Sequence, residues 1–419
     1  MNKKNLAVVL TFFAILTAGT LASILKPHEE YSTSENRVLA EHPQLSAEEI
    51  FHGSYQEDYE TWLNDQFPLR DCFVSLSSYS QRLFGKKDIN GVYLGRDGYL
   101  IEKPDETAFD SLQLEDNIRF LSQFLNHATD TYGKERVCCM MVPSKAVVLT
   151  DRLPLFAASA DFPSLSGGNL KSAQGDSISE QIKKALTEPD ILLDVTNCLL
   201  AHQSEYIYYR TDHHWTTLGA YYAYAAWASK TAHTPRPLSA YQKEDIYEDF
   251  YGTTYNKVRI RTVPDTVTLF HTPEESGIRI RKNDSSGIRK YDSLYFPAEA
   301  TDSPIHGSSN RYDIFLGGNT GKIIIDTGTK TDRTLLVIKD SFANCFVPFL
   351  TGDYRQIILI DYRYTKKTIT DITAEHNGIT DILVLFNTDK FCRDTGLKPL
   401  AGEIRSETMD EFDADEFFK

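Results

Sequence analysis

An acidic residue and a histidine lie two positions apart in Asp212-His213-His214-Trp215, near the middle of the chain. Histidine titrates close to neutral pH, so its imidazole is the usual proton carrier of enzyme sites. In an extended backbone Asp212 and His214 lie on one face, about 7 Å apart, so a slight bend lets the carboxylate orient the imidazole. His213 points the other way and is expected to pack or to lie on the surface. This acid and base need a nucleophile from elsewhere in the chain.

Ser341 is the best candidate nucleophile. It follows the apolar run Leu335–Ile338, which predicts a buried strand, and it precedes a predicted helical segment, 342–350. A hydroxyl at a strand end is held at the sheet edge, where backbone N–H groups of the next turn can face a developing oxyanion. Serine is also a good helix N-cap, a role that needs no catalysis. Ser144, after the apolar run 137–142, is the alternative nucleophile.

Six further residues are candidates for oxyanion or substrate contacts, and each has a structural alternative: Trp215, Tyr209, Arg210, Lys145, Asn319 and Asn387. The Trp215 indole either lines the site or packs in the core. Tyr209 and Arg210 either contact substrate or lie at the end of a strand. Lys145 is either a cationic substrate contact or a solvated side chain. Asn319 follows two glycines, so a place in a turn explains this residue as well as an oxyanion contact does. Asn387 follows the last predicted strand.

A metal site is the rival interpretation of Asp212-His213-His214. Adjacent histidine side chains diverge, so two of them rarely bind one ion together. A phosphoesterase of the Asp-His-His type would need further acidic clusters upstream, and no spaced Asp-x-Asp precedes the motif. We therefore predict neither a metal nor an organic cofactor.

Charge and cysteine usage restrict the function further. The net charge of −15 argues against general nucleic-acid binding, because a phosphate backbone would repel the chain. The cysteines show no metal spacing, and we expect all six to be buried apolar residues rather than disulfide partners. They are Cys72, Cys138, Cys139, Cys198, Cys345 and Cys392. The adjacent pair should point to opposite faces of one strand.

The N-terminus predicts export. Lys3 and Lys4 precede an uncharged apolar run, 6–25, which is long enough to cross a bilayer with its N-terminus in the cytoplasm. We favour an uncleaved anchor, and a signal peptide cleaved near residues 20–22 is the alternative. Both interpretations place the remainder of the chain outside the cytoplasm, attached to the membrane in the first case and secreted in the second.

Short apolar runs alternate with helical patterns over residues 137–386, which predicts an α/β fold with a doubly wound parallel sheet covered on both faces. Such sheets place their sites at the carboxyl ends of the strands. Residues 235–320 interrupt the alternation and are interpreted as a β-rich insertion, with short alternating runs such as 257–261. The predicted organisation is an anchor or signal segment over 1–26, a stalk and helical region over 27–90, a catalytic domain over 91–402, and an acidic tail over 403–419.

Asp212-His213-His214-Trp215 matches the motif that gives the DHHW family of bacterial exported proteins its name. It is also similar to the Asp-x-His-Trp motif of the alginate O-acetylation proteins, which have an SGNH-hydrolase-like domain. The resemblance extends over residues 35 to about 390. It is carried by Glu35-Asn36-Arg37, the segment 64–70, the predicted hairpin 91–100, Val142-Pro143-Ser144-Lys145, Leu153-Pro154 and Lys339-Asp340-Ser341-Phe342.

The resemblance implies a Ser-His-Asp triad of Ser341, His214 and Asp212, in which the acid and base precede the serine. It implies an extracytoplasmic O-acetyltransferase that modifies hydroxyls of a cell-envelope or secreted polysaccharide. A multi-spanning membrane O-acyltransferase would be the partner that supplies the acetyl group. No carbohydrate-binding module is recognisable after residue 400, so glycan contacts are expected on the catalytic domain, around 235–320. The alternatives are a carbohydrate acetylesterase with the same triad and an inactive scaffold of a polysaccharide-modifying complex.

Overall fold

A central eight-stranded sheet organises the fold of this computed structural model, in the order β11-β10-β12-β14-β13-β15-β6-β7. The structure describes residues 3–402 apart from 33–36, 47–49, 52, 104–110, 156, 158–176, 285–286 and 377, so the predicted acidic tail lies outside the described residues. The strands are β6 Val137–Val142, β7 Leu192–Asp194, β10 Arg279–Asp284, β11 Gly287–Tyr291, β12 Lys322–Asp326, β13 Thr334–Lys339, β14 Gln356–Ile360 and β15 Asp381–Asn387.

The sheet is parallel in one half and antiparallel in the other. Strands β14, β13, β15, β6 and β7 pair in parallel, whereas β12, β10 and β11 add to the β14 edge in antiparallel register. The α/β fold with a parallel sheet is therefore confirmed, and the antiparallel edge is an addition that the alternation of runs did not predict. Its strands come from residues 279–326, outside the regular alternation.

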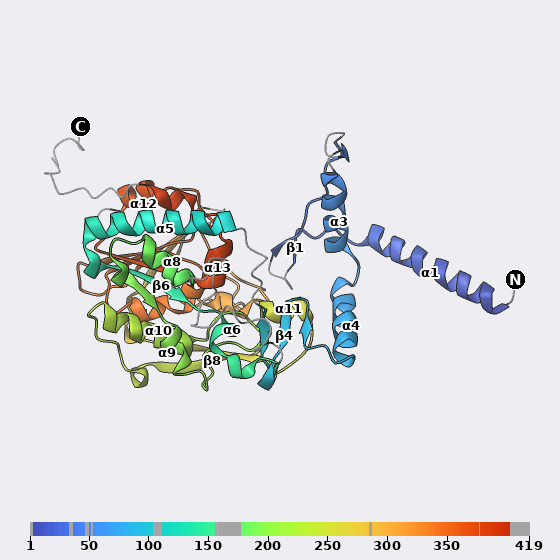
Figure 1. The fold of residues 1–419 in the computed structure, drawn as a ribbon, viewed down its shortest axis with the longest axis horizontal. Helices are drawn as coiled ribbons and strands as arrows, with labels where there is room; N and C mark the ends of the chain where they lie inside the picture. The colour runs from blue at the N-terminus through green and yellow to red at the C-terminus, as the bar shows by residue number, and fades with distance from the viewer. Residues whose placement is uncertain are drawn as a thin grey trace.

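Helices cover both faces of the sheet (Figure 1). One face packs against α5 Ser111–Tyr132, α8 Ile178–Ala185, α12 Ile369–Glu375 and α13 Thr388–Arg393. The other face packs against α6 Lys145–Val148, α9 Thr196–Leu200 and α10 Thr217–Lys230, and against two short 3₁₀ turns, Ser341–Cys345 and Val347–Leu350. Strand side chains alternate between the two cores, so Cys138 lies in one and Cys139 in the other, as predicted.

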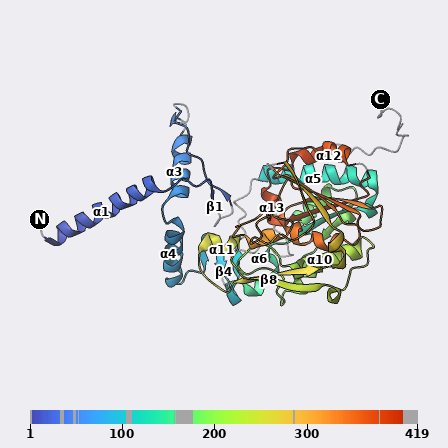
Figure 2. The same ribbon diagram turned by 180° about the vertical axis from the view of Figure 1, so that it is seen from behind.

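The N-terminal part of the chain projects from this body, as both ribbon views show (Figure 2). It comprises α1 Lys3–Leu25, the strand pair β1 Tyr31–Ser32 and β2 Arg37–Val38, and the helices α3 Ser54–Gln66 and α4 Arg70–Leu83. A small antiparallel sheet then joins it to the body through β3 Asp88–Ile89, β4 Val92–Leu94 and β5 Leu100–Glu102. Lys4–Leu25 is fully exposed and is long and apolar enough to cross a membrane, a test that a signal sequence also passes.

The predicted β-rich insertion contains a separate antiparallel pair, β8 Gln242–Phe250 and β9 Asp265–His271, joined by the short helix α11 Thr253–Val258. The expectation of a strand-like run at 257–261 is wrong, because Lys257 and Val258 end α11 and Arg259 has a left-handed backbone. The boundaries of the insertion and of the catalytic domain remain predictions.

The cysteines follow the prediction only in part. All six are free thiols, and four of them are buried. Cys198 is partly buried, and Cys72 on α4 is exposed, so the expectation of burial is wrong for Cys72. Helix α4 belongs to the N-terminal part that projects from the body (Figure 1), and Cys72 lies on its exposed side.

Candidate active site

Asp212, His214 and Ser341 form a continuous chain of hydrogen bonds. Asp212 Oδ1 lies 2.6 Å from His214 Nδ1, and His214 Nε2 lies 2.7 Å from Ser341 Oγ. A carboxylate can only accept, so Nδ1 carries the proton and Nε2 is left to accept the hydroxyl proton of Ser341. The folded chain thus brings a hydroxyl, a base and an acid together in the order that nucleophilic acyl chemistry uses.

The His214 imidazole is held between two other rings. It stacks on Tyr312 with the ring centroids 3.8 Å apart and an interplanar angle of 8°, and His213 lies 3.9 Å away on a tilted ring. Phe342 contacts the same imidazole at 4.9 Å. These contacts leave His214 one ring orientation, which is the one that aims Nε2 at the serine.

Asp212 is buried and fully hydrogen-bonded. Its Oδ1 accepts from the backbone N–H and the ring of His214, and its Oδ2 accepts from the backbone N–H and the hydroxyl of Thr253, each at 2.8 Å. Burial opposes ionisation, but the neighbouring His214 and His213 and these hydrogen bonds hold the pKa of Asp212 well below its ordinary value. Asp212 therefore stays a carboxylate at any physiological pH.

A tight loop carries the acid and the base. Tyr208 and Trp215 form an isolated antiparallel bridge, and the Tyr209 N–H donates to the His214 carbonyl at 3.2 Å. The loop ends where the Thr216 side chain caps α10 by accepting from the Gly219 N–H. The helix N-cap therefore fixes the C-terminal side of the motif.

Lys145 holds the backbone carbonyls of this loop in place. Its buried ammonium donates to the carbonyls of Tyr209, Arg210 and Asp212 at 2.9, 3.3 and 2.8 Å. Burial lowers the pKa of Lys145 to about 8, although nearby carboxylates such as Asp265 oppose the shift. Lys145 was expected to be a substrate contact or a solvated lysine, and its three hydrogen bonds instead make it a clamp on the loop backbone.

Asp265 holds backbone N–H groups of the same loop in place. It accepts from the backbone N–H groups of Arg210 and Thr211, at 2.5 and 2.7 Å, and from the hydroxyls of Thr211 and Tyr206. Its side chain is fully buried, and burial raises its pKa against the opposing effect of these donors. Asp265 is the first residue of β9, so the predicted insertion helps to shape the motif loop.

Ser341 occupies the turn that follows β13. Asp340 caps this turn by accepting from the Phe342 N–H at 2.8 Å and from the Asn387 N–H at 2.7 Å, which joins the ends of β13 and β15. Trp215 Nε1 donates to the Phe342 carbonyl at 2.9 Å, and the Tyr312 hydroxyl donates to the Ser341 carbonyl at 2.9 Å. The motif loop and the serine turn are therefore bonded to each other at several points.

A buried polar network lies behind the serine turn. Lys339 Nζ donates to Asn319 Oδ1 and Asn344 Oδ1, at 3.0 and 2.7 Å, and lies 3.6 Å from Asp361. Burial lowers the pKa of Lys339 to about 8, opposed by Asp361. Asn319, predicted as an oxyanion donor, therefore sits in a network that supports the turn, and among the described residues its side chain is bonded to Lys339 and Asn344 and not to Ser341.

The other predicted contacts take mainly structural positions. Trp215 and Tyr209 are fully buried in the core. The Arg210 guanidinium lies over the rings of Tyr206 and Tyr99. Asn387 lines a cleft, but its amide donates to the Val142 carbonyl and its oxygen caps α13.

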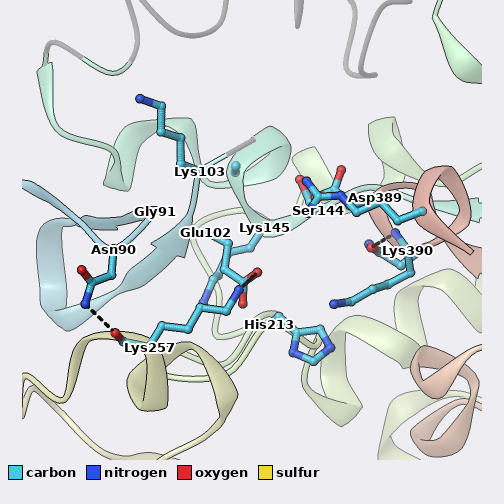
Figure 3. A pocket seen from close by; sticks show the side chains of 13 residues that line it. Asn90, Gly91, Glu102, Lys103, Ser144, Lys145, His213, Lys257, Asp389 and Lys390 are labelled. Carbon is cyan, nitrogen blue, oxygen red and sulfur yellow. Dashed lines mark hydrogen bonds and ion pairs between the residues drawn. The ribbon is translucent and has the colours of Figure 1, made fainter. Parts of the chain in front are cut away.

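A polar cleft opens beside the motif at the carboxyl ends of β6 and β15 (Figure 3). Its lining includes His213 and the alternative nucleophile Ser144. Ser144 lies near Asp389, and among the described residues it has no hydrogen bond to His214. The charged residues of the lining are Glu102, Lys103, Lys145, Lys257, Asp389, Lys390 and Arg393. We call this the cationic cleft, because five of these seven side chains are basic.

The metal interpretation has one observation in its favour. Asp212, His213 and His214 each offer a ligand atom, and these three atoms all lie within 4.8 Å of one another. However, both carboxylate oxygens of Asp212 and both ring nitrogens of His214 are engaged in protein hydrogen bonds. An ion would have to break these bonds, so the donor set fits a hydrogen-bonded site better.

Sequence reasoning missed three residues that complete the site, namely Thr253, Asp265 and Tyr312. All three come from the predicted insertion, where no spacing connects them to the motif. The Asp265 and Thr253 side chains carry no local signal, because their partners lie 40 or more positions away. Only the position of Thr253 just after a glycine hinted at a helix start.

Comparisons with known proteins agree with this architecture. Residues 191–360 match the DHHW protein family, and residues 92–258 match the SGNH hydrolase-like domain of the acetyltransferase AlgX. A DHHW family protein from Eubacterium siraeum shares 25% identity and a TM-score of 0.56, over 76% of this chain and 98% of its own. PatB1 from Bacillus cereus, solved with a sulfonyl adduct, shares the fold at 17% identity and a TM-score of 0.53, over 75% of this chain and 100% of its own.

No curated protein matches the chain. The two family matches overlap, and together they include the motif loop, the insertion and the serine turn. The chain therefore contains a region that matches the DHHW protein family and a region that resembles the SGNH hydrolase-like domain of an acetyltransferase.

Proposed function

We propose that this protein is a membrane-anchored, extracytoplasmic O-acetyltransferase that acetylates hydroxyls of a cell-envelope or secreted polysaccharide. Ser341 is the nucleophile, His214 the general base and Asp212 the residue that orients the base. The observation that carries the proposal is the hydrogen bond of 2.7 Å between Ser341 Oγ and His214 Nε2, with Asp212 behind the same ring. The acetyltransferase-like domain match supports acyl transfer as the reaction class.

The proposed reaction has two half-reactions. Ser341 Oγ attacks the acetyl carbonyl of the donor while His214 Nε2 takes the serine proton, and the bond to the donor group then breaks as His214 passes this proton to the leaving group. An acceptor hydroxyl then attacks the acetyl-serine ester as His214 takes its proton. The bond to Ser341 breaks, and the serine oxygen recovers the proton from His214.

The proposed oxyanion donor is the N–H of Ser341. Asp340 occupies the N–H of Phe342, so that group is not available to a tetrahedral intermediate. In the described part of the chain no acceptor is bonded to the Ser341 N–H, which lies at the start of its 3₁₀ turn. A donor fixed in advance beside the reacting carbon stabilises developing charge effectively.

The N-terminal helix supports the proposed location. An apolar helix of 22 residues, preceded by lysine, favours a cytoplasmic N-terminus and a catalytic domain on the outer side. An acetyl donor would then reach Ser341 through a multi-spanning membrane O-acyltransferase, the partner that we propose.

One experiment tests the reaction. The full chain in detergent is given an activated acetyl ester, with and without a glycan acceptor, and acetate release and glycan acetylation are measured. We expect acetylated glycan from the parent, and a loss of about 10⁴-fold in Ser341→Ala and His214→Ala. Acetate release without transfer would identify an esterase. Turnover by Ser341→Ala at the parental rate would show that the triad is wrong.

A further inference from the structure

His213 is the one member of the motif that the proposed triad leaves without a role. Its side chain lines the cationic cleft and is 19% exposed, whereas the side chain of His214 is 5% exposed. In Figure 3 its ring lies at the floor of the cleft, with the Lys390 side chain reaching toward it. The two histidine rings are adjacent, so the cleft and the base are separated by one ring.

The bonds of Thr253 fix which nitrogen of His213 carries a proton. The Thr253 hydroxyl has one proton, and it donates to the Asp212 carboxylate at 2.8 Å. The same oxygen lies 2.6 Å from His213 Nδ1, so it must accept there, and Nδ1 must be protonated. A neutral His213 then has its lone pair on Nε2.

The surroundings keep His213 neutral. Burial is the main effect that lowers its pKa well below the ordinary value, and the neighbouring His214 and Lys390 add to it. Asp212 and Glu102 oppose the shift without reversing it. Among the described residues, none is hydrogen-bonded to Nε2, so the cleft presents an unprotonated nitrogen that can accept a hydrogen bond.

We propose that His213 Nε2 accepts a hydrogen bond from a hydroxyl of the acceptor sugar and thereby positions that sugar beside His214. This inference rests on the proposed transferase function and adds the acceptor site to it. The hydroxyl is the suitable partner, because a cation would be repelled by Lys390 and a bare anion cannot donate to a lone pair. A sugar held there by one hydroxyl presents a neighbouring hydroxyl toward the base.

Two amide substitutions distinguish the roles of the two ring nitrogens of His213. In His213→Asn the side-chain amide can still donate to Thr253, but the acceptor in the cleft is lost. In His213→Gln the amide oxygen reaches about the position of Nε2 and can accept. We expect His213→Asn to lower kcat/KM for the acceptor about tenfold, the scale of one lost hydrogen bond, and His213→Gln to recover most of it.

The full chain in detergent is assayed with p-nitrophenyl acetate as donor and with cellopentaose or pentagalacturonate as acceptor. The readout is the ratio of acetyl transfer to ester hydrolysis measured without acceptor, because both substitutions also remove the ring contact between His213 and His214 and therefore change hydrolysis itself. Equal transfer losses in His213→Asn and His213→Gln, or no loss in either, would overturn the inference.

Other outcomes of the same assay test the proposed function itself. A parent that neither hydrolyses the ester nor transfers acetyl would contradict the triad itself. A parent that hydrolyses the ester but acetylates neither sugar would contradict the acceptor role of His213 and leave the triad in place.

Discussion

Asp212 accepts four hydrogen bonds, and its two oxygens face different parts of the chain. One oxygen orients His214, and the other is fixed by Thr253 at the start of α11. The backbone of Gly252 passes directly over the same carboxylate, so a side chain at that position would overlap it. At the scale of single residues, the site thus depends on a glycine that allows the insertion to approach the acid.

Gly252→Ala should lower kcat/KM for ester hydrolysis about 10²-fold. The added Cβ would overlap Asp212 Cβ and Oδ2, and a displaced carboxylate no longer orients His214. Steady-state kinetics with an activated acetyl ester measure the effect. Gly277→Ala is the matched control, because its new Cβ would come no closer than 3.3 Å to any neighbour. Parental activity in Gly252→Ala would mean that the position of Asp212 does not matter.

Asp313, next to the ring that stacks on His214, should make stability depend on pH. Burial is the main effect that raises its pKa from 3.8 to about 6, opposed by Asn310 and Lys282. Between these values the folded state binds more protons than the unfolded state, so this contribution is complete below about pH 4 and is lost as pH rises through 6.

Asp313→Asn removes that contribution. We expect the stability of the variant relative to the parent to increase between pH 4 and pH 7, because only the parent loses stability over that window. Urea unfolding midpoints at the two pH values measure the difference. A difference between variant and parent that stays constant with pH would contradict a raised pKa at this position.

The motif loop is irregular backbone, and elements far apart in the sequence supply its hydrogen bonds. Lys145 at the start of α6 binds three of its carbonyls, Asp265 at the start of β9 binds two of its N–H groups, and Trp215 joins it to the serine turn. Buried backbone groups need such partners. At the scale of elements, α6, α11 and β9 together shape the acid and the base.

Lys145→Met should therefore reduce both stability and activity. Three buried carbonyls would lose a charged donor, which we expect to cost about 3 kcal/mol of unfolding free energy. A loosened loop should lower kcat/KM about 10²-fold. Lys103→Met is the matched control, since Lys103 lines the same cleft but pairs with Asp88 at a partly exposed position. Denaturant unfolding and ester hydrolysis measure the two effects, and a change no larger than that of the control would contradict the clamp.

The chain as a whole is acidic, whereas the cleft beside His213 is lined mainly by basic residues. The chain has a net charge of −15, yet five of the seven charged residues that line the cleft beside His213 are basic. A local field of this sign attracts anionic groups, so we expect the preferred acceptor to carry carboxylates or phosphates. The exposed N-terminal helix is the other large-scale feature, and it is long and apolar enough to cross a membrane.

Lys390→Glu should raise KM for pentagalacturonate about fivefold at low salt and leave KM for cellopentaose nearly unchanged. The effect should shrink as ionic strength rises, because salt screens exposed charges. Transfer assays at two salt concentrations test this. Lys330→Glu, at an exposed position outside the cleft lining, is the matched control. An equal effect of both substitutions on both acceptors would indicate a general change of charge instead of a local contact.

The sequence by itself determined the features that depend on neighbouring residues. Apolar runs marked β13, β15 and β6, because burial follows a local pattern. The spacing of Asp212 and His214 already allowed the carboxylate to meet the imidazole. The position of Ser341 after the apolar run 335–338 made it the candidate nucleophile, and the family resemblance implied the same residue.

Only the tertiary structure decided how these parts meet. Ser341 and His214 are 127 positions apart, and their contact depends on how β13 and the motif loop pack. The roles of Thr253, Asp265 and Tyr312, the use of Lys145 as a clamp, and the proton position on His213 follow from contacts between distant segments. Sequence patterns report local geometry, whereas hydrogen bonds across such separations depend on the packing of the whole fold.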